Sequence, residues 1–151
     1  MKNGEVIVDR WTGDLEEIKA FYAECRYGAI DSVRQEDLIL TAKMRGQGIV
    51  GVVRIAEEGG VKVLRGMQVL PELRGRGIVG PALRLECGCR IARECYLTTY
   101  PNLIAFYSQI LFRVIPTKAA PKFMQERIRG HREKHRGEKR YVMMRRNPNY
   151  I

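Results

Sequence analysis

A glycine-rich turn between an apolar strand and a helix is the segment of this 151-residue chain best suited to chemistry. Its residues are Arg74-Gly75-Arg76-Gly77-Ile78-Val79-Gly80, preceded by Val69-Leu70-Pro71 and followed by Pro81. Such a turn directs unpaired backbone N–H groups toward one point and adds the positive end of the helix dipole. Proline suits the first helical turn because its missing N–H has no partner within the helix there. The segment therefore predicts a binding site for a pyrophosphate group.

Two common phosphate-binding motifs fit this turn poorly. A nucleotide P-loop requires Lys-Ser or Lys-Thr at its end, and the turn has neither. The three glycines of the turn have the spacing of a dinucleotide-binding fingerprint. That fingerprint also requires an acidic residue about 20 positions later, at the end of a strand. Glu94 lies near that distance and precedes the next strand instead of ending it. We therefore disfavour both motifs.

The turn resembles the acyl-CoA-binding motif of the GNAT superfamily of N-acetyltransferases, Arg/Gln-x-x-Gly-x-Gly/Ala after a strand that ends Val-x-Pro. The matching residues are Val69, Pro71, Arg74, Gly77 and the apolar Ile78. Val79 departs from the motif, because it stands where the family has Gly or Ala. Its β-branched side chain would crowd the pyrophosphate or the neighbouring strand, unless Gly80 lets the backbone shift.

A second segment, from Thr98 to Phe112, resembles the GNAT element in which a short helix carries Phe-Tyr and a Gly-Phe follows. Tyr107 and Phe112 have the family spacing, with Leu111 where the family usually has Gly. A helix that ends without Gly must turn through the left-handed region, at a cost of about 1 kcal/mol. The resemblance implies that Tyr107 is the general acid that protonates the leaving thiolate; the alternative is a packed aromatic ring with a satisfied hydroxyl.

The resemblance implies an enzyme that uses acetyl-CoA as co-substrate and acetylates a primary amine by direct attack. A backbone N–H of the strand before the turn, Val69 or Leu70, would hold the developing oxyanion. The expected cofactor-binding residues are Val69, Leu70, Arg74, Gly75, Arg76, Gly77, Ile78, Val79, Gly80 and Asn102. The acceptor is expected to be an amine-bearing small molecule or peptide. A neutral or acidic amine is favoured because a protein of net charge +10 repels polycations.

No general base is evident in the sequence. The segment from Val61 to Leu70 contains no Asp, Glu or His. Water relayed to Glu24 or Glu36 remains an open alternative. The second functional hypothesis is a non-catalytic GNAT-fold module that binds acyl-CoA or an acidic macromolecule.

Positive charge is concentrated near the C-terminus, which is the basis of that second hypothesis. Between Lys118 and Arg146 there are eleven Lys or Arg and three Glu, a net of +8 out of the chain's +10. Such a segment could contact RNA or another acidic partner. It has few aromatic residues for stacking and no known nucleic-acid motif, so we favour a solvated basic face that attracts the anionic cofactor.

Neither the histidines nor the cysteines predict a metal site. His131 and His135 are four residues apart on a predicted helix, but no third ligand follows and neighbouring cations oppose a metal ion. The four cysteines are expected to be reduced thiols, since Cys87 and Cys89 lie on different sides of a helix. We expect no metal.

Hydrophobic periodicity predicts an α/β chain that forms a single GNAT-like domain over residues 1–151. The expected strands are Glu5–Arg10, Asp37–Met44, Ile49–Glu57, Val61–Leu70, Cys95–Tyr100 and Lys139–Arg145. The expected helices are Asp14–Cys25, Ile78–Arg93, Leu103–Leu111 and Lys122–Arg136. This order corresponds to a central, mixed, mostly antiparallel sheet flanked by helices. With no apolar run of about 18 residues and no signal-peptide core at its N-terminus, the chain is expected to be cytoplasmic, without membrane contact. A homodimer is an open possibility.

Overall fold

The structure is a computed structural model that describes residues 5–134 and 141–147. Its strands hydrogen-bond in the order β1-β2-β3-β4-β5-β7-β6. They are β1 (Val6–Arg10), β2 (Leu38–Met44), β3 (Ile49–Glu58), β4 (Val61–Val69), β5 (Cys95–Thr99), β6 (Arg113–Ile115) and β7 (Val142–Arg146). The α-helices are α1 (Leu15–Glu24), α2 (Val79–Arg90), α3 (Ile104–Ser108) and α4 (Lys122–Lys134). The predicted α/β class with a mixed, mostly antiparallel sheet is confirmed.

The sequence prediction differs from this structure in three elements. Helix α2 was expected to run from Ile78 to Arg93, but it ends at Arg90, three residues earlier. Strand β6 was not predicted, because its three residues are too few to show a period. Helix α3 has five residues and begins one residue later than expected, after the short 3₁₀ helix η3 (Pro101–Leu103). The expected end of the last helix at Arg136 and the expected start of the last strand at Lys139 lie outside the described residues.

Contacts along the chain group into two compact units, which we describe separately. Of the described residues, the first contains 5–57 and Leu64–Arg90, and the second contains Glu58–Val63, 91–134 and 141–147.

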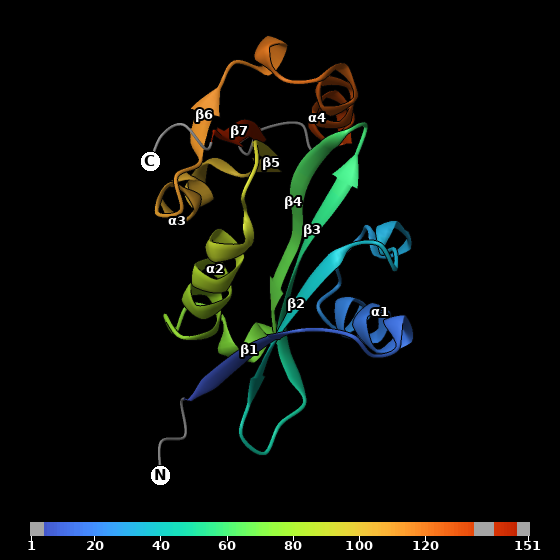
Figure 1. Cartoon of the computed structure of the whole chain (residues 1–151), viewed down its shortest axis with the longest axis vertical. Helices are drawn as coiled ribbons and strands as arrows, with labels where there is room; N and C mark the ends of the chain where they lie inside the picture. The colour runs from blue at the N-terminus through green and yellow to red at the C-terminus, as the bar shows by residue number, and fades with distance from the viewer. Residues whose placement is uncertain (1–4, 135–140, 148–151) are drawn as a thin grey trace. The chain divides into compact units, whose positions relative to one another are not determined.

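In the first unit, α1 and α2 cover opposite faces of the sheet formed by β1 to β4 (Figure 1). The β2–β3 pair carries a register shift between Ala42 and Lys43. Helix α1 begins where the Asp14 side chain accepts a hydrogen bond from the Glu16 amide at 2.9 Å, an N-cap that satisfies one of the free amides of the first turn. Its buried residues follow the helical period: Ile18, Phe21 and Tyr22.

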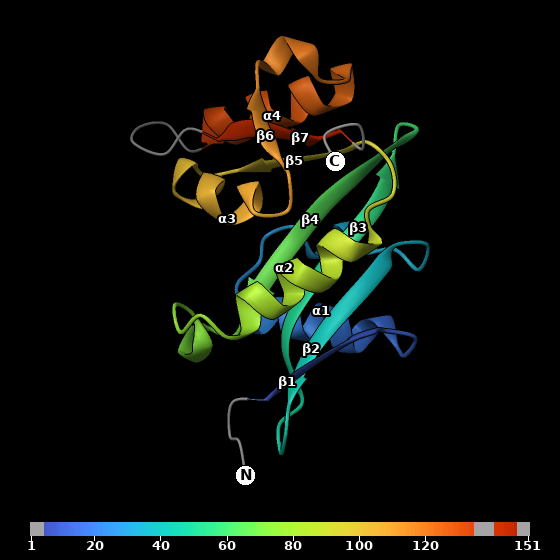
Figure 2. The same ribbon diagram turned by 60° about the vertical axis from the view of Figure 1, so that its left-hand side comes forward.

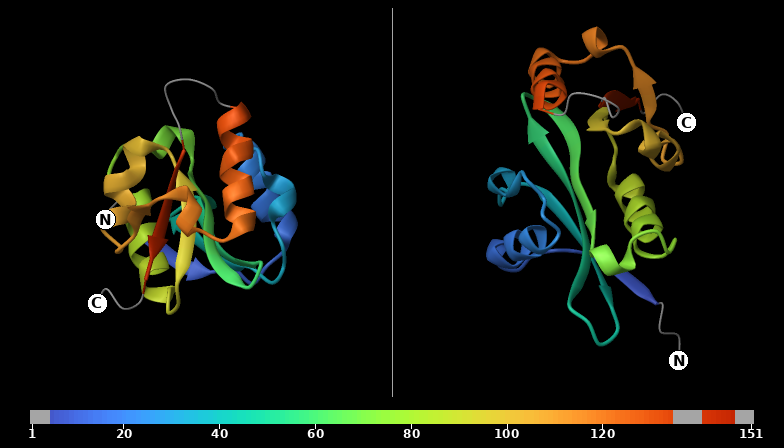
Figure 3. Two further views of the ribbon diagram at one scale, coloured as in Figure 1. Left: turned by 90° about the horizontal axis from the view of Figure 1, so that it is seen from above. Right: turned by 180° about the vertical axis from the view of Figure 1, so that it is seen from behind.

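In the second unit, α3 and α4 lie on opposite faces of the strands β5, β7 and β6 (Figure 2 and Figure 3). The start of β4 pairs in parallel with β5 at Lys62 and Val63. The core of this unit consists of Val63, Tyr96, Ala120, Met124, Ile128 and Met143. An ion pair between Arg127 and Glu58 joins α4 to the end of β3.

Two helices end in left-handed residues that are not glycine. Leu111 follows α3 with φ of +73°, which confirms that the helix turns there without the family's glycine. The amide of Phe112 donates to the carbonyl of Tyr107, so the turn still caps the helix. Arg26 follows α1 with φ of +59° and has an exposed side chain. Each residue keeps this conformation at a steric cost that glycine would avoid.

Replacing Arg26 by Gly should therefore stabilise the protein by about 0.5–1 kcal/mol, measured by chemical denaturation. The matched control is Glu24→Gly, at the last residue of the same helix, where Gly should instead destabilise by up to about 1 kcal/mol. If both substitutions destabilise the protein equally, the strain assigned to Arg26 is absent.

The described residues contain no helix that is long and apolar enough to cross a membrane. None of the four cysteines, all of which the structure describes, forms a disulfide: Cys25, Cys87 and Cys95 are buried and Cys89 is exposed.

Candidate functional site

The glycine-rich turn lies in the first unit, between the end of β4 and the start of α2. After Val69 the chain forms the 3₁₀ helix η2 (Pro71–Leu73), and then Gly75 and Gly77 adopt φ values of +74° and +70°. A Cβ atom placed on either glycine would meet no described atom within 4 Å. Their backbone is therefore open on the side where side chains would stand, and the positive φ values explain why glycine is needed there.

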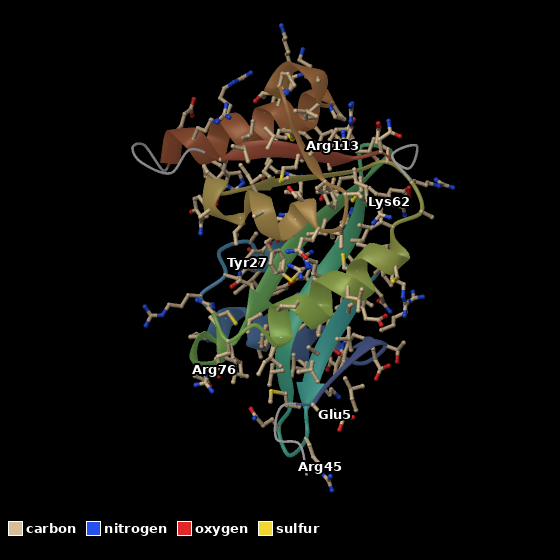
Figure 4. The ribbon with its side chains drawn as sticks, turned by 90° about the vertical axis from the view of Figure 1, so that its left-hand side faces the viewer. Glu5, Tyr27, Arg45, Lys62, Arg76 and Arg113 are labelled. Atoms are coloured by element: carbon tan, nitrogen blue, oxygen red, sulfur yellow. The ribbon has the colours of Figure 1, made fainter. Side chains whose placement is uncertain are left out.

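Arginine side chains border this open backbone. Arg74 turns back to β4, where its Nε donates to the carbonyl of Val69 at 2.8 Å and its Nη2 to Oε1 of Gln68 at 3.3 Å. This clamp fixes the loop to the strand that precedes it. Arg76 is exposed on the loop (Figure 4). The glycines thus lie in a loop that carries two arginines and leads into the N-terminus of α2, a combination that favours anion binding.

Val79, the departure from the motif, is accommodated by a glycine on a neighbouring strand. The Val79 side chain is only 1% exposed, and its Cγ1 would lie 2.8 Å from a Cβ atom placed on Gly51 of β3. The bulk of Val79 therefore occupies the space that Gly51 leaves empty. Ile78, the preceding residue, is partly exposed.

The two predicted oxyanion donors differ in availability. The Leu70 amide donates to the carbonyl of Val50 at 3.0 Å, which takes it out of consideration as an oxyanion donor. The Val69 amide is therefore the remaining candidate of the two. The carbonyl of Val69 accepts hydrogen bonds from Arg74 and from the Cys25 thiol. Burial raises the pKa of that thiol, so Cys25 is held in its protonated, donating form.

Tyr107 and Asn102 belong to the second unit. Tyr107 is buried on α3, and its ring centroid lies 5.1 Å from that of Phe106 and 6.2 Å from that of Phe112. Asn102 is exposed in η3. The aromatic packing fixes the Tyr107 ring, while its role as an acid remains a prediction.

A buried polar cluster that the sequence analysis missed lies beside β4 in the first unit. At its centre is Arg54 of β3, whose side chain is fully buried and donates to Oδ2 of the equally buried Asp37 at 2.9 Å. Arg54 also donates to Ser32 and to the hydroxyl of Tyr22, which in turn donates to the carbonyl of Gly66. The sequence does contain one indication of this cluster, because Arg54 is the only charged residue between Ile49 and Ala56. A charge in such a strand requires a buried partner.

Comparison by sequence finds no matching protein-family model and no matching curated protein. Comparison by structure finds many acetyltransferases. A GNAT-family acetyltransferase from Staphylococcus aureus has a TM-score of 0.60 at 16% identity, over 95% of this chain and 99% of that one. A GNAT-family acetyltransferase from Brucella melitensis, solved in complex with acetyl-CoA, has a TM-score of 0.55 at 23% identity, over 73% and 84%. An acetyltransferase from Bacillus subtilis, solved in complex with CoA, has a TM-score of 0.63 at 13% identity, over 95% and 99%. The chain has the GNAT fold.

In this GNAT-fold chain, several cations of the basic C-terminal segment are used inside the second unit. Arg127 pairs with Glu58, and Arg132 donates through Nε and Nη2 to the carbonyl of Tyr141 at 3.1 and 2.8 Å. Arg146 is buried. These contacts give part of the segment a structural role, and the Glu58 carboxylate neutralises the charge of Arg127.

The remaining candidates carry little chemistry. His131 stacks on Tyr141 with ring centroids 4.6 Å apart, and His135 lies outside the described residues. Within residues 5–134 and 141–147, no three His, Cys, Asp or Glu side chains gather into a metal site. Glu24 and Glu36, the suggested distant bases, are both exposed on the surface of the first unit.

Proposed function

We propose that this protein is an acetyl-CoA-dependent N-acetyltransferase that acetylates a primary amine by direct attack. The observation that carries the proposal is the open backbone of Gly75 and Gly77 at the start of α2, clamped by Arg74 and bordered by Arg76. This arrangement fits a pyrophosphate, which needs amide donors and positive charge but no metal ion. The CoA and acetyl-CoA bound to the Bacillus and Brucella proteins support the same co-substrate here.

The proposed reaction forms one C–N bond and breaks one C–S bond. The neutral amine attacks the thioester carbonyl carbon, and a backbone amide of β4 stabilises the negative charge that develops on the carbonyl oxygen. The C–S bond then breaks, and Tyr107 gives its proton to the departing thiolate. The proton lost by the amine passes to water, and Tyr107 regains a proton from water before the next turnover. Little side-chain chemistry is required beyond these groups.

The alternative, a binding module without activity, draws its support from the basic C-terminal segment. The internal contacts of Arg127 and Arg132 weaken that support. A neutral or acidic amine, either a small molecule or a peptide, remains the proposed acceptor, because the net charge of +10 disfavours polycationic acceptors. The cytoplasm is the proposed location.

The experiment that tests the proposal is CoA thiol release from acetyl-CoA against a panel of amines. On the best acceptor, Tyr107→Phe should lower kcat about 100-fold with little change in acetyl-CoA affinity, because only the proton donor is removed. Tyr141→Phe is the matched control, since Tyr141 also sits in an aromatic cluster of the second unit. Equal kcat values for wild type and Tyr107→Phe would assign Tyr107 to packing alone.

A further inference from the structure

Strand β4 is distorted at a position where only glycine fits. Gly66 has φ of +68°, and a Cβ atom placed on it would lie 2.3 Å from the hydroxyl oxygen of Tyr22. That hydroxyl, on the buried face of α1, lies 2.9 Å from the Gly66 carbonyl oxygen. The contact spans two elements that are far apart in sequence, and it falls within the strand that ends at the glycine-rich turn.

The direction of this hydrogen bond follows from its neighbour. Nε of Arg54 lies 3.1 Å from the Tyr22 hydroxyl, and a guanidinium group can only donate. The Tyr22 oxygen must therefore accept from Arg54, which leaves its own hydrogen to donate to Gly66. Burial raises the pKa of Tyr22 above its usual range, so the hydroxyl keeps this hydrogen at neutral pH.

Arg54 is itself held from its other end. Its Nη1 donates to Asp37 Oδ2 at 2.9 Å and to the Ser32 carbonyl at 3.1 Å, and its Nη2 donates to the Ser32 hydroxyl at 2.9 Å. Arg54, Tyr22 and Gly66 thus form one directed chain of hydrogen bonds, in which each group donates to the next. A chain of this kind polarises each successive group, and its first donor is a buried guanidinium that Asp37 and Ser32 hold in place.

The chain ends on the peptide that joins Gly66 to Met67. Because every described peptide is trans, the Met67 N–H points opposite to the Gly66 carbonyl, away from Tyr22. Leu70 directs its amide at Val50 of β3, so in an extended strand the amides of Met67 and Val69 leave the opposite edge. A polarised carbonyl also makes the N–H of the same peptide a stronger donor.

We propose that Tyr22 is a positioning residue: through the Gly66 carbonyl, it orients and polarises the Met67 N–H to donate to the thioester carbonyl oxygen of bound acetyl-CoA. Met67 thereby takes the oxyanion role in place of Val69, whose amide lies about 7 Å farther along the same strand edge, too far to share one oxygen. This inference rests on the proposed function, because it needs an acyl thioester at the site.

The test is the infrared carbonyl band of acetyl-CoA labelled with ¹³C at the acetyl carbonyl, bound to the full-length protein. In wild type the band should shift to lower frequency on binding, and in Tyr22→Phe this shift should be smaller, because the Met67 N–H still donates but is less polarised. With the best amine, kcat of Tyr22→Phe should fall about tenfold while KM for acetyl-CoA stays within about twofold, since one donor weakens without being lost. If the role of Tyr22 is purely structural, acetyl-CoA bound to Tyr22→Phe should show the same band as acetyl-CoA bound to wild type.

The matched control is Tyr27→Phe. Its ring centroid lies 4.5 Å from that of Tyr22, and its hydroxyl is 3.4 Å from Nη2 of Arg54. The variant therefore loses a hydroxyl from the same cluster without touching the Gly66 bond. It should keep the wild-type band. Arg54→Lys is a second variant, which keeps the charge beside Asp37 but loses the Nε donor, and it should move the band part of the way. A wild-type band in folded Tyr22→Phe or Arg54→Lys overturns the inference, whereas wild-type protein that binds no acetyl-CoA overturns the proposed function itself.

Discussion

Gly77→Asp should abolish the binding of acetyl-CoA. In wild type, saturating acetyl-CoA should raise Tm by the mass-action stabilisation, which is about 2.7 kcal/mol at one hundred times Kd. The aspartate would place a carboxylate among the glycine amides that are proposed to hold the pyrophosphate, and like charges repel there. The Tm of the folded variant should therefore be the same with and without acetyl-CoA.

Backbone strain must be separated from this charge effect, because Gly77 has φ of +70° and any other residue is strained there. Gly46→Asp is the matched control. Gly46 has φ of +78°, and a Cβ atom on it meets no described atom within 4 Å, but it lies in the β2–β3 hairpin next to Arg45 (Figure 4). Both variants should lose similar intrinsic stability, and only Gly46→Asp should retain the acetyl-CoA shift. A full shift in Gly77→Asp would mean that the turn does not hold the pyrophosphate.

The parts of the fold that could be predicted from the sequence are those encoded by neighbouring residues. The strands β2, β3 and β4 follow from runs of apolar residues separated by glycine turns. The glycine-rich turn was recognisable because anion binding by backbone amides needs several glycines close together in the chain. The left-handed Leu111 could be predicted for the same reason, since the end of a helix is a local event.

Features that depend on residues far apart in the chain could not be predicted. In the sequence around the turn, Val79 is a departure from the motif. Only the structure shows that Gly51, on a neighbouring strand, makes room for its side chain. Arg54 finds its partners 17, 32 and 22 residues away in Asp37, Tyr22 and Ser32. Hydrophobic periodicity carries no information about such pairings, because it reports which face is buried and not what lies opposite. The amide of Leu70 is likewise used by a neighbouring strand.

The buried ion pair between Asp37 and Arg54 predicts a second large effect, on the free energy of unfolding. Asp37→Asn should destabilise the protein by about 3 kcal/mol, because it leaves the Arg54 guanidinium buried without a counter-charge. The amide oxygen of Asn can still accept from the Arg34 amide, which now donates to Asp37 Oδ2 at 3.0 Å. The loss of unfolding free energy would therefore report mainly on the removal of the negative charge of Asp37. Urea denaturation, with the m-value checked for constancy, gives the measurement.

Two further variants separate burial of the charge from the chemical change itself. Asp31→Asn makes the same substitution at an exposed residue of the same connection between α1 and β2, and it should change the free energy of unfolding by less than about 0.5 kcal/mol. The double variant Asp37→Asn with Arg54→Met removes both charges, so it should be more stable than Asp37→Asn alone, since the penalty comes from the uncompensated charge and not from the missing pair. A double variant less stable than the single one would show that Arg54 stabilises the fold chiefly through Ser32 and Tyr22.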